Sequence, residues 1–132
     1  MSNADVKANR PLSPHIWIYR WRMTMIMSIV HRITGMGLYF GTALLAWWLM
    51  AAATSEHAFR IANGFLGSWF GILILIGFTW ALIHHLLGGL RHFVWDTGRG
   101  MGKPARDNLA IANLVASVVL TIIVVVIGFM VA

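Results

Sequence analysis

Three long stretches of the chain contain no charged residue, and each is long enough to cross a lipid bilayer as a helix. These stretches cover residues 33–55, 61–90 and 108–132. A helix of about 20 apolar residues spans the roughly 30 Å hydrocarbon core of a membrane. Residues 23–30 are also apolar and lengthen the first stretch. We therefore predict three transmembrane helices, at about 23–53, 62–95 and 107–131.

The composition agrees with this pattern. Of the 132 residues, 59% are hydrophobic and 11% are charged, whereas about 25% of the residues of an ordinary soluble domain are charged. A soluble domain of this size could not cover its surface with so few polar side chains. We expect an all-α integral membrane protein, with an N-terminal segment (1–22) followed by one membrane-anchor domain (23–132).

A formal charge of +6 raises the question of a nucleic-acid partner. Nucleic-acid-binding proteins carry their cations on one continuous face, but here long apolar stretches separate them. The cations instead indicate topology, because Lys and Arg are enriched in short cytoplasmic flanks. They lie around the start of the first helix (Lys7, Arg10, Arg20, Arg22, Arg32) and near the second loop (Arg91, Arg99, Lys103, Arg106), with Arg60 alone in the first loop. This distribution indicates that the chain is surrounded by membrane lipid and does not bind nucleic acid. It also predicts that the N-terminus and the second loop are cytoplasmic.

The first 22 residues resemble neither a secretory signal nor a transit peptide. They are polar, contain Pro11 and Pro14, and lack an apolar run followed by a small-residue cleavage site. We expect a multi-pass protein of the bacterial inner membrane, or a mature protein of the mitochondrial inner membrane.

Small and polar residues inside the predicted spans indicate helix packing. Gly37 and Gly41 form a small-xxx-small pair in the first predicted helix, and Gly67 and Gly71 form another in the second. In the third, the polar stripe Asn113, Ser117 and Thr121 at i, i+4 and i+8 should face protein rather than lipid.

Candidate chemistry lies at one end of the first two helices. Ser28 and Arg32 share a face of the first helix at i and i+4, and His31 lies three positions after Ser28. On the second helix, His85, Gly89 and His92 share a face. Ionisable residues at membrane depth are costly and indicate function. Arg91 and His92, at the boundary of the span, could instead extend to the lipid headgroups.

His85 is a candidate haem ligand. The chain has no cysteine, so metal chemistry must rest on histidine, which is a common axial ligand of haem iron. Gly89, one turn from His85, leaves room for a flat macrocycle beside the backbone. His84 cannot be the opposite ligand, because successive helical side chains diverge by about 100°. A second histidine would come from His31 or from another subunit.

The first two helices are antiparallel, so their functional residues should meet near the cytoplasmic face. Cations there could bind anionic haem propionates. Hydroxyl and guanidinium groups could donate to a quinone carbonyl, whose negative charge grows on reduction.

Two spaced motifs resemble the signatures of the cytochrome b subunit of succinate dehydrogenase, respiratory complex II (the cytochrome b556 family). The matching residues are Arg10-Pro11-Leu12 with Ser28-x-x-His31-Arg32-x-Thr34, and His85-x-x-x-Gly89-Leu90-Arg91-His92-Phe93-x-Trp95-Asp96-x-Gly98. The resemblance covers essentially the whole chain. It implies that the three helices form half of a heterodimeric haem-binding bundle.

The resemblance also implies partners and residue roles. The partners would be a second membrane anchor, an iron–sulfur subunit and a succinate-oxidising flavoprotein, so this chain alone would not oxidise succinate. His85 would be an axial ligand of haem b, and the partner anchor would supply the other. Ser28 and Arg32 would bind ubiquinone, and His31 and Arg32 would lie near the haem propionates. Arg91 and His92 are further candidates for binding the haem, because they are expected at the same depth in the membrane. His84 has no implied role.

Two alternative functions share these sequence features. The first is the anchor of a fumarate reductase, which runs the reaction in the opposite direction. The second is a purely structural membrane anchor that binds neither haem nor quinone, in which His85 and Arg32 would only contribute to packing.

Overall fold

The computed structural model describes residues 20–131, and their regular structure is entirely helical. The N-terminal segment through residue 19 and Ala132 lie outside this part of the chain. The described helices are α2 (Met23–Thr54), α3 (Glu56–Leu66), α4 (Trp69–Asp96) and α5 (Lys103–Val131).

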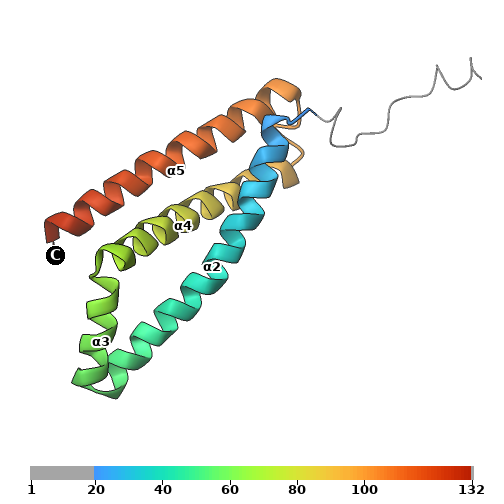
Figure 1. Ribbon diagram of the computed structural model, residues 1–132. Coiled ribbons are helices and arrows are strands. Elements are labelled where there is room, and N and C mark those ends of the chain that lie inside the picture. Colours follow the sequence, from blue (N-terminus) through green and yellow to red (C-terminus); the bar gives the residue numbers. More distant parts are fainter. Residues whose placement is uncertain (1–19, 132) are drawn as a thin grey trace, which may run out of the picture.

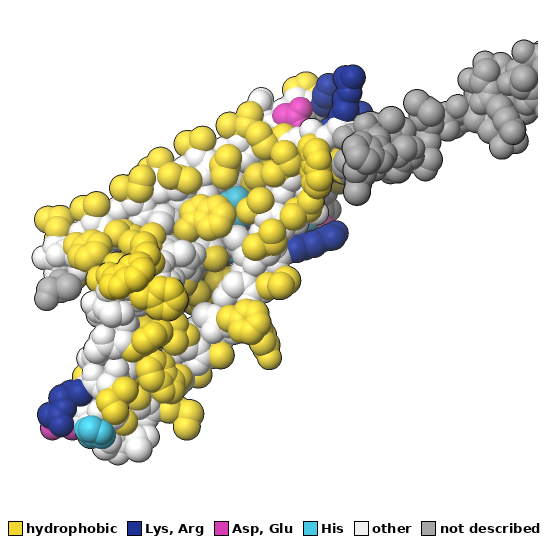
Figure 2. Space-filling view, viewed as in Figure 1, with side chains coloured by type: hydrophobic (Ala, Val, Ile, Leu, Met, Phe, Trp, Pro, Cys, Tyr) yellow, Lys and Arg dark blue, Asp and Glu magenta, His cyan; other side chains and the backbone are white. Residues whose placement is uncertain are grey.

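Three of these helices, α2, α4 and α5, are long and apolar enough to cross a membrane. Hydrophobic side chains cover the visible surface between two ends that carry the charged groups (Figure 2). Most large apolar side chains of the three helices are exposed, as expected when lipid or a partner subunit is their solvent. The predicted all-α membrane fold is therefore confirmed.

The predicted second helix, 62–95, is divided into two helices by a break at Gly67 and Ser68. The Ser68 hydroxyl accepts a hydrogen bond from the Gly71 backbone N–H at 3.1 Å and so caps the start of α4. Gly67 is consequently the C-cap of α3 rather than part of a small-residue pair within one helix. Gly71 has a different packing role, since a Cβ there would lie 2.6 Å from the Leu66 Cα atom.

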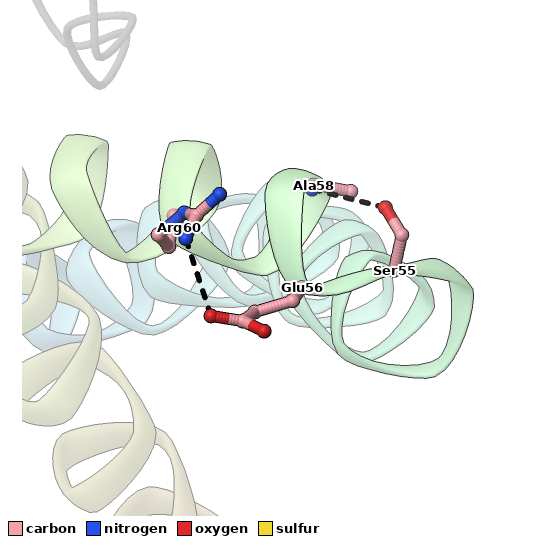
Figure 3. Close-up of polar contacts among 4 residues, drawn as sticks. All are labelled: Ser55, Glu56, Ala58 and Arg60. Atoms are coloured by element: carbon pink, nitrogen blue, oxygen red, sulfur yellow. Dashed lines mark hydrogen bonds and ion pairs between the residues drawn. The ribbon is translucent and has the colours of Figure 1, made fainter.

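The short helix α3 connects the end of α2 to the start of α4 (Figure 1). Its start is stabilised by the Ser55 hydroxyl, which accepts from the Ala58 N–H at 3.2 Å, and by an exposed Arg60–Glu56 ion pair at 3.2 Å (Figure 3). At its other end, the Trp48 indole N–H donates to the Asn63 side-chain oxygen at 2.8 Å. Helix α3 therefore closes one end of the three-helix arrangement.

Helix α4 packs against both α2 and α5, while α2 and α5 come together near their starts and diverge farther along (Figure 1). The residues of α5 that face the other helices are small or polar. Its buried residues are Ala110, Asn113, Ser117 and Thr121. The predicted inward orientation of the polar stripe is confirmed.

The predicted pair Gly37 and Gly41 also lies at a helix interface. A Cβ at Gly37 would touch the Cβ of Ala81 at 4.0 Å, and Gly41 makes room for the ring of Phe78. Close approach of α2 and α4 thus depends on small residues of α2, and it continues along both helices to the histidines.

Candidate functional site

His31 of α2 and His85 of α4 stack face to face where these helices pack closely. Their ring centroids are 3.9 Å apart and their planes differ by 6°. Each ring lies over a glycine of the opposite helix. A Cβ on Gly35 would come within 3.0 Å of His85 Cε1, and a Cβ on Gly88 within 2.5 Å of His31 Nδ1. The two glycines therefore permit the stack.

The hydrogen bonds of His85 define its tautomer. His85 Nδ1 lies 3.1 Å from the backbone oxygen of His31 and 3.3 Å from Thr34 Oγ1. A carbonyl oxygen only accepts, so Nδ1 carries the proton and Nε2 has a free lone pair. The buried Thr34 hydroxyl donates to the same His31 oxygen at 2.9 Å, which leaves its own oxygen able to accept from His85.

The hydrogen bonds of His85 Nδ1 with the His31 oxygen and the Thr34 hydroxyl are of the kind that supports a metal-binding imidazole. Histidine ligands commonly donate their other ring N–H to a backbone carbonyl or another acceptor, which fixes the ring orientation. Sequence reasoning placed Thr34 in a motif but gave it no role. Its spacing three residues after His31 was the available signal, because a threonine hydroxyl often bonds the backbone oxygen three or four residues earlier.

The side of His85 towards Gly89 is open. His85 is half-buried, and a Cβ on Gly89 would meet nothing within 4 Å. Residues four positions apart on a helix are separated by about 40° around its axis, so Gly89 lies on nearly the same face of α4 as His85. The structure therefore leaves space beside the histidine for a flat group, as the sequence predicted.

Ser28 and Arg32 lie on the part of α2 next to His31 and Gly35. Both side chains are exposed, and neither makes a hydrogen bond or ion pair with another residue in the 20–131 range. Their i, i+4 spacing brings them side by side on one helix face. The hydroxyl and the guanidinium group are therefore free to donate to a ligand.

His92 joins the cluster, whereas Arg91 lies on a different side of α4. The exposed His92 ring is 5.7 Å from the His31 ring and 5.1 Å from that of Trp95. Arg91 is buried, with its guanidinium carbon 5.0 Å from the Trp95 ring centroid. Its Nε and Nη1 atoms have no hydrogen-bond partner among the described residues. The guanidinium group thus retains unused donors.

His84 has a role that sequence reasoning did not assign. It is buried between α4 and α5, where its Nδ1 lies 3.1 Å from Ser117 Oγ and 3.3 Å from Asn113 Nδ2. The Trp80 ring packs beside it at 5.1 Å. The available signal was the polar stripe of α5, which needed a polar partner on a neighbouring helix. His84 therefore joins two helices and faces away from the open side of His85.

The candidate residues thus divide into three groups. His31, His85 and His92 form one cluster, Ser28 and Arg32 lie on the adjoining exposed face, and Arg91 and His84 lie inside the chain. Over residues 20–131, no group of three His, Cys, Asp or Glu side chains is arranged to hold a metal ion.

The comparisons with known proteins show the family of the chain. The family described as the succinate dehydrogenase/fumarate reductase transmembrane subunit matches residues 6–125, which include every candidate residue above. The chain belongs to this family. It is 45% identical to the succinate dehydrogenase cytochrome b556 subunit of Paracoccus denitrificans over 96% of this chain and 98% of the relative.

Two further relatives carry similar names. The cytochrome b556 subunit of Rickettsia felis is 32% identical over 90% of this chain and 93% of its own length. The mitochondrial cytochrome b560 subunit of Sus scrofa is 36% identical over 88% of this chain and 70% of its own length. Family membership and these relatives establish a membrane-anchor subunit of succinate dehydrogenase, a component of an enzyme complex.

Proposed function

We propose that this anchor subunit binds haem b together with a second membrane-anchor subunit and forms part of the site where ubiquinone is reduced to ubiquinol. The observation that carries this proposal is the geometry of His85. Its Nδ1–H is engaged with the His31 backbone oxygen and Thr34, which leaves Nε2 for iron. Two relatives that match at least 90% of this chain are named as cytochrome b556 subunits.

The residues present fit a haem group. Gly89 leaves open space next to His85, and the buried His31 Nδ1 atom has no hydrogen-bond partner among the described residues. When bound, the haem would store one electron at a potential set by its axial ligands and the charge around it. Arg32 and His92 are exposed near His85 and, with His31, would hold the anionic propionates.

The second axial ligand would come from the partner anchor rather than from His31. Two rings stacked at 3.9 Å and 6° have their nitrogens side by side. Two rings stacked in this way would not hold one haem iron between them. His31 therefore supports His85 from the side, and its backbone oxygen holds the ligand in orientation.

Ser28 and Arg32 would bind the quinone. The Ser28 hydroxyl and the Arg32 guanidinium group would donate hydrogen bonds to a quinone carbonyl oxygen and stabilise the negative charge that develops there. Reduction to the quinol requires two electrons, arriving singly from the iron–sulfur subunit, and one proton on each of the two quinone oxygens. We infer that these protons come from the cytoplasmic side.

The distribution of cations supports the orientation in the membrane. The N-terminal segment and the second loop carry most of the Lys and Arg residues, which favours a cytoplasmic location for both in a bacterial inner membrane. The iron–sulfur subunit would dock on this side, close to Ser28 and Arg32, and would receive its electrons from the flavoprotein that oxidises succinate. The named relatives support succinate oxidation as the physiological direction, rather than fumarate reduction.

The quinone assignment is tested in the purified complex with Ser28→Ala and Arg32→Leu. We expect each variant to lower ubiquinone reduction at least ten-fold, while succinate oxidation with a soluble artificial electron acceptor is retained. Thr42→Ala, an exposed change farther along α2, serves as the control and should leave both activities unchanged. Equal loss of both activities in a fully assembled complex would contradict the assignment.

A further inference from the structure

A polar cavity lies between the starts of α2 and α5, away from the histidine cluster. It has a volume of about 280 Å³ and is lined by six residues: Arg22, Met23, Thr24, Lys103, Arg106 and Asp107. Figure 2 shows Lys and Arg side chains at this end of the molecule. The lining carries three cations and one carboxylate, so it has a positive balance, and none of these side chains takes part in the proposed binding of haem or quinone.

The cations of this cavity are not neutralised within the described chain. In residues 20–131 the single ion pair joins Arg60 to Glu56 at the other end of the molecule, so Asp107 pairs with none of them. Arg106 is half-buried, and its buried Nε atom has no hydrogen-bond partner among the residues described. A buried donor without an acceptor is costly, which indicates that an anion belongs here.

The backbone adds to this positive field. Helices α2 and α5 both begin at the cavity, and the positive ends of their dipoles meet there. Arg22 gives α2 no side-chain cap, and neither helix has an acidic residue in its first turn. The starts of α3 and α4, in contrast, are capped by Ser55 and Ser68.

The position of the cavity identifies the source of the anion. Helices α2 and α5, both apolar enough to cross a membrane, begin at Met23 and Lys103, and the charge-free stretch of α5 begins only at residue 108. The cavity therefore lies at the charged end of both helices, next to their apolar stretches. Lipid phosphates are concentrated at this depth, and Met23 offers an apolar wall for the glycerol end of a lipid. We propose that Arg22, Lys103 and Arg106 bind the phosphate of an anionic phospholipid headgroup.

The experiment measures binding of phosphatidylglycerol to the detergent-purified complex by native mass spectrometry. Arg106→Gln and Lys103→Gln should each weaken the tightest phosphatidylglycerol binding by about five-fold, the effect of one cation near a membrane surface. Arg99→Gln removes the same charge from the neighbouring loop outside the cavity lining, and it should change the affinity by less than about two-fold. Equal weakening by all three variants would overturn the site, because only net charge would then matter.

Two further arms identify the ligand and control for folding. Phosphatidylcholine and inorganic phosphate at the same concentration should not displace phosphatidylglycerol. Displacement by inorganic phosphate would assign the cavity to a free anion and overturn the lipid assignment. Phosphatidylglycerol should also raise the thermal midpoint of the wild-type complex more than that of an Arg106→Gln complex. An equal rise in both would count against the proposal.

Discussion

His31 and His85 stack in parallel at 3.9 Å, and each ring lies over a glycine of the opposite helix. The backbone oxygen of His31 also accepts a hydrogen bond from the Nδ1–H group of His85. The orientation of the candidate haem ligand is therefore set by α2, through the stacked ring, a carbonyl group and Thr34. Residues that need not touch the haem should consequently change its spectrum.

Thr34→Val tests the support of His85. The change keeps the shape of the side chain but removes the oxygen that lies 3.3 Å from His85 Nδ1. Loss of such a supporting partner typically lowers metal affinity or activity about 10- to 100-fold. We expect a lower haem content and a shifted low-spin electron-spin-resonance signal in the purified complex.

Thr42→Val is the matched control for that variant. Thr42 lies on the same helix, but it is exposed and its hydroxyl donates to the Leu38 backbone oxygen. Its replacement should leave haem content and signal unchanged. If the Thr34 variant behaves like this control, Thr34 does not support the ligand.

Gly89→Ala tests the open side of His85. Within this chain the added methyl group meets nothing within 4 Å, and alanine stabilises a helix by up to about 1 kcal/mol relative to glycine. We therefore expect the isolated chain to lose no stability while the haem content of the complex falls. Absorbance gives the ratio of haem to protein, and thermal unfolding gives the stability.

Gly88→Ala should behave differently, because a Cβ at Gly88 would lie 2.5 Å from His31 Nδ1. We expect displacement of the His31 ring and loss of stability, whether or not haem is bound. A Gly89→Ala complex with its full haem content would show that no macrocycle lies beside Gly89.

The α4–α5 contact at His84 should affect stability rather than electron transfer. Ser117→Ala removes the hydroxyl that lies 3.1 Å from His84 Nδ1. Hydrogen bonds between transmembrane helices contribute about 0.6 kcal/mol on average and up to about 1.7 kcal/mol. We expect the free energy of unfolding, measured by detergent titration, to fall by this amount while the haem spectrum stays the same. A shifted haem spectrum would mean that His84 contributes to the haem site.

The membrane spans could be predicted from the sequence, but the division of 61–90 could not. Absence of charge indicates that a segment lies in lipid, and it says nothing about whether the backbone is one continuous helix. The break depends on local capping, in which Ser68 satisfies the Gly71 N–H. A serine inside an apolar stretch does not by itself reveal that role.

The pairs of candidate residues that lie on one helix could be predicted from their spacing in the sequence. His85 with Gly89, and Ser28 with Arg32, are intrahelical pairs, so helical periodicity placed them correctly. The pairing of His84 with Ser117 depends on which faces of α4 and α5 meet, and that is decided by packing between helices. The burial of the Arg91 side chain could not be predicted for the same reason.

The adjacent histidines provide the most direct test of the haem assignment. His85→Gln and His84→Gln are identical changes at neighbouring positions, and only His85 has its Nδ1 proton engaged by a carbonyl beside an open space. We measure the optical and electron-spin-resonance spectra of the haem in both purified complexes. The account predicts that His85→Gln abolishes or shifts the low-spin signal while His84→Gln retains it. An unchanged low-spin signal in the His85 variant would contradict the account.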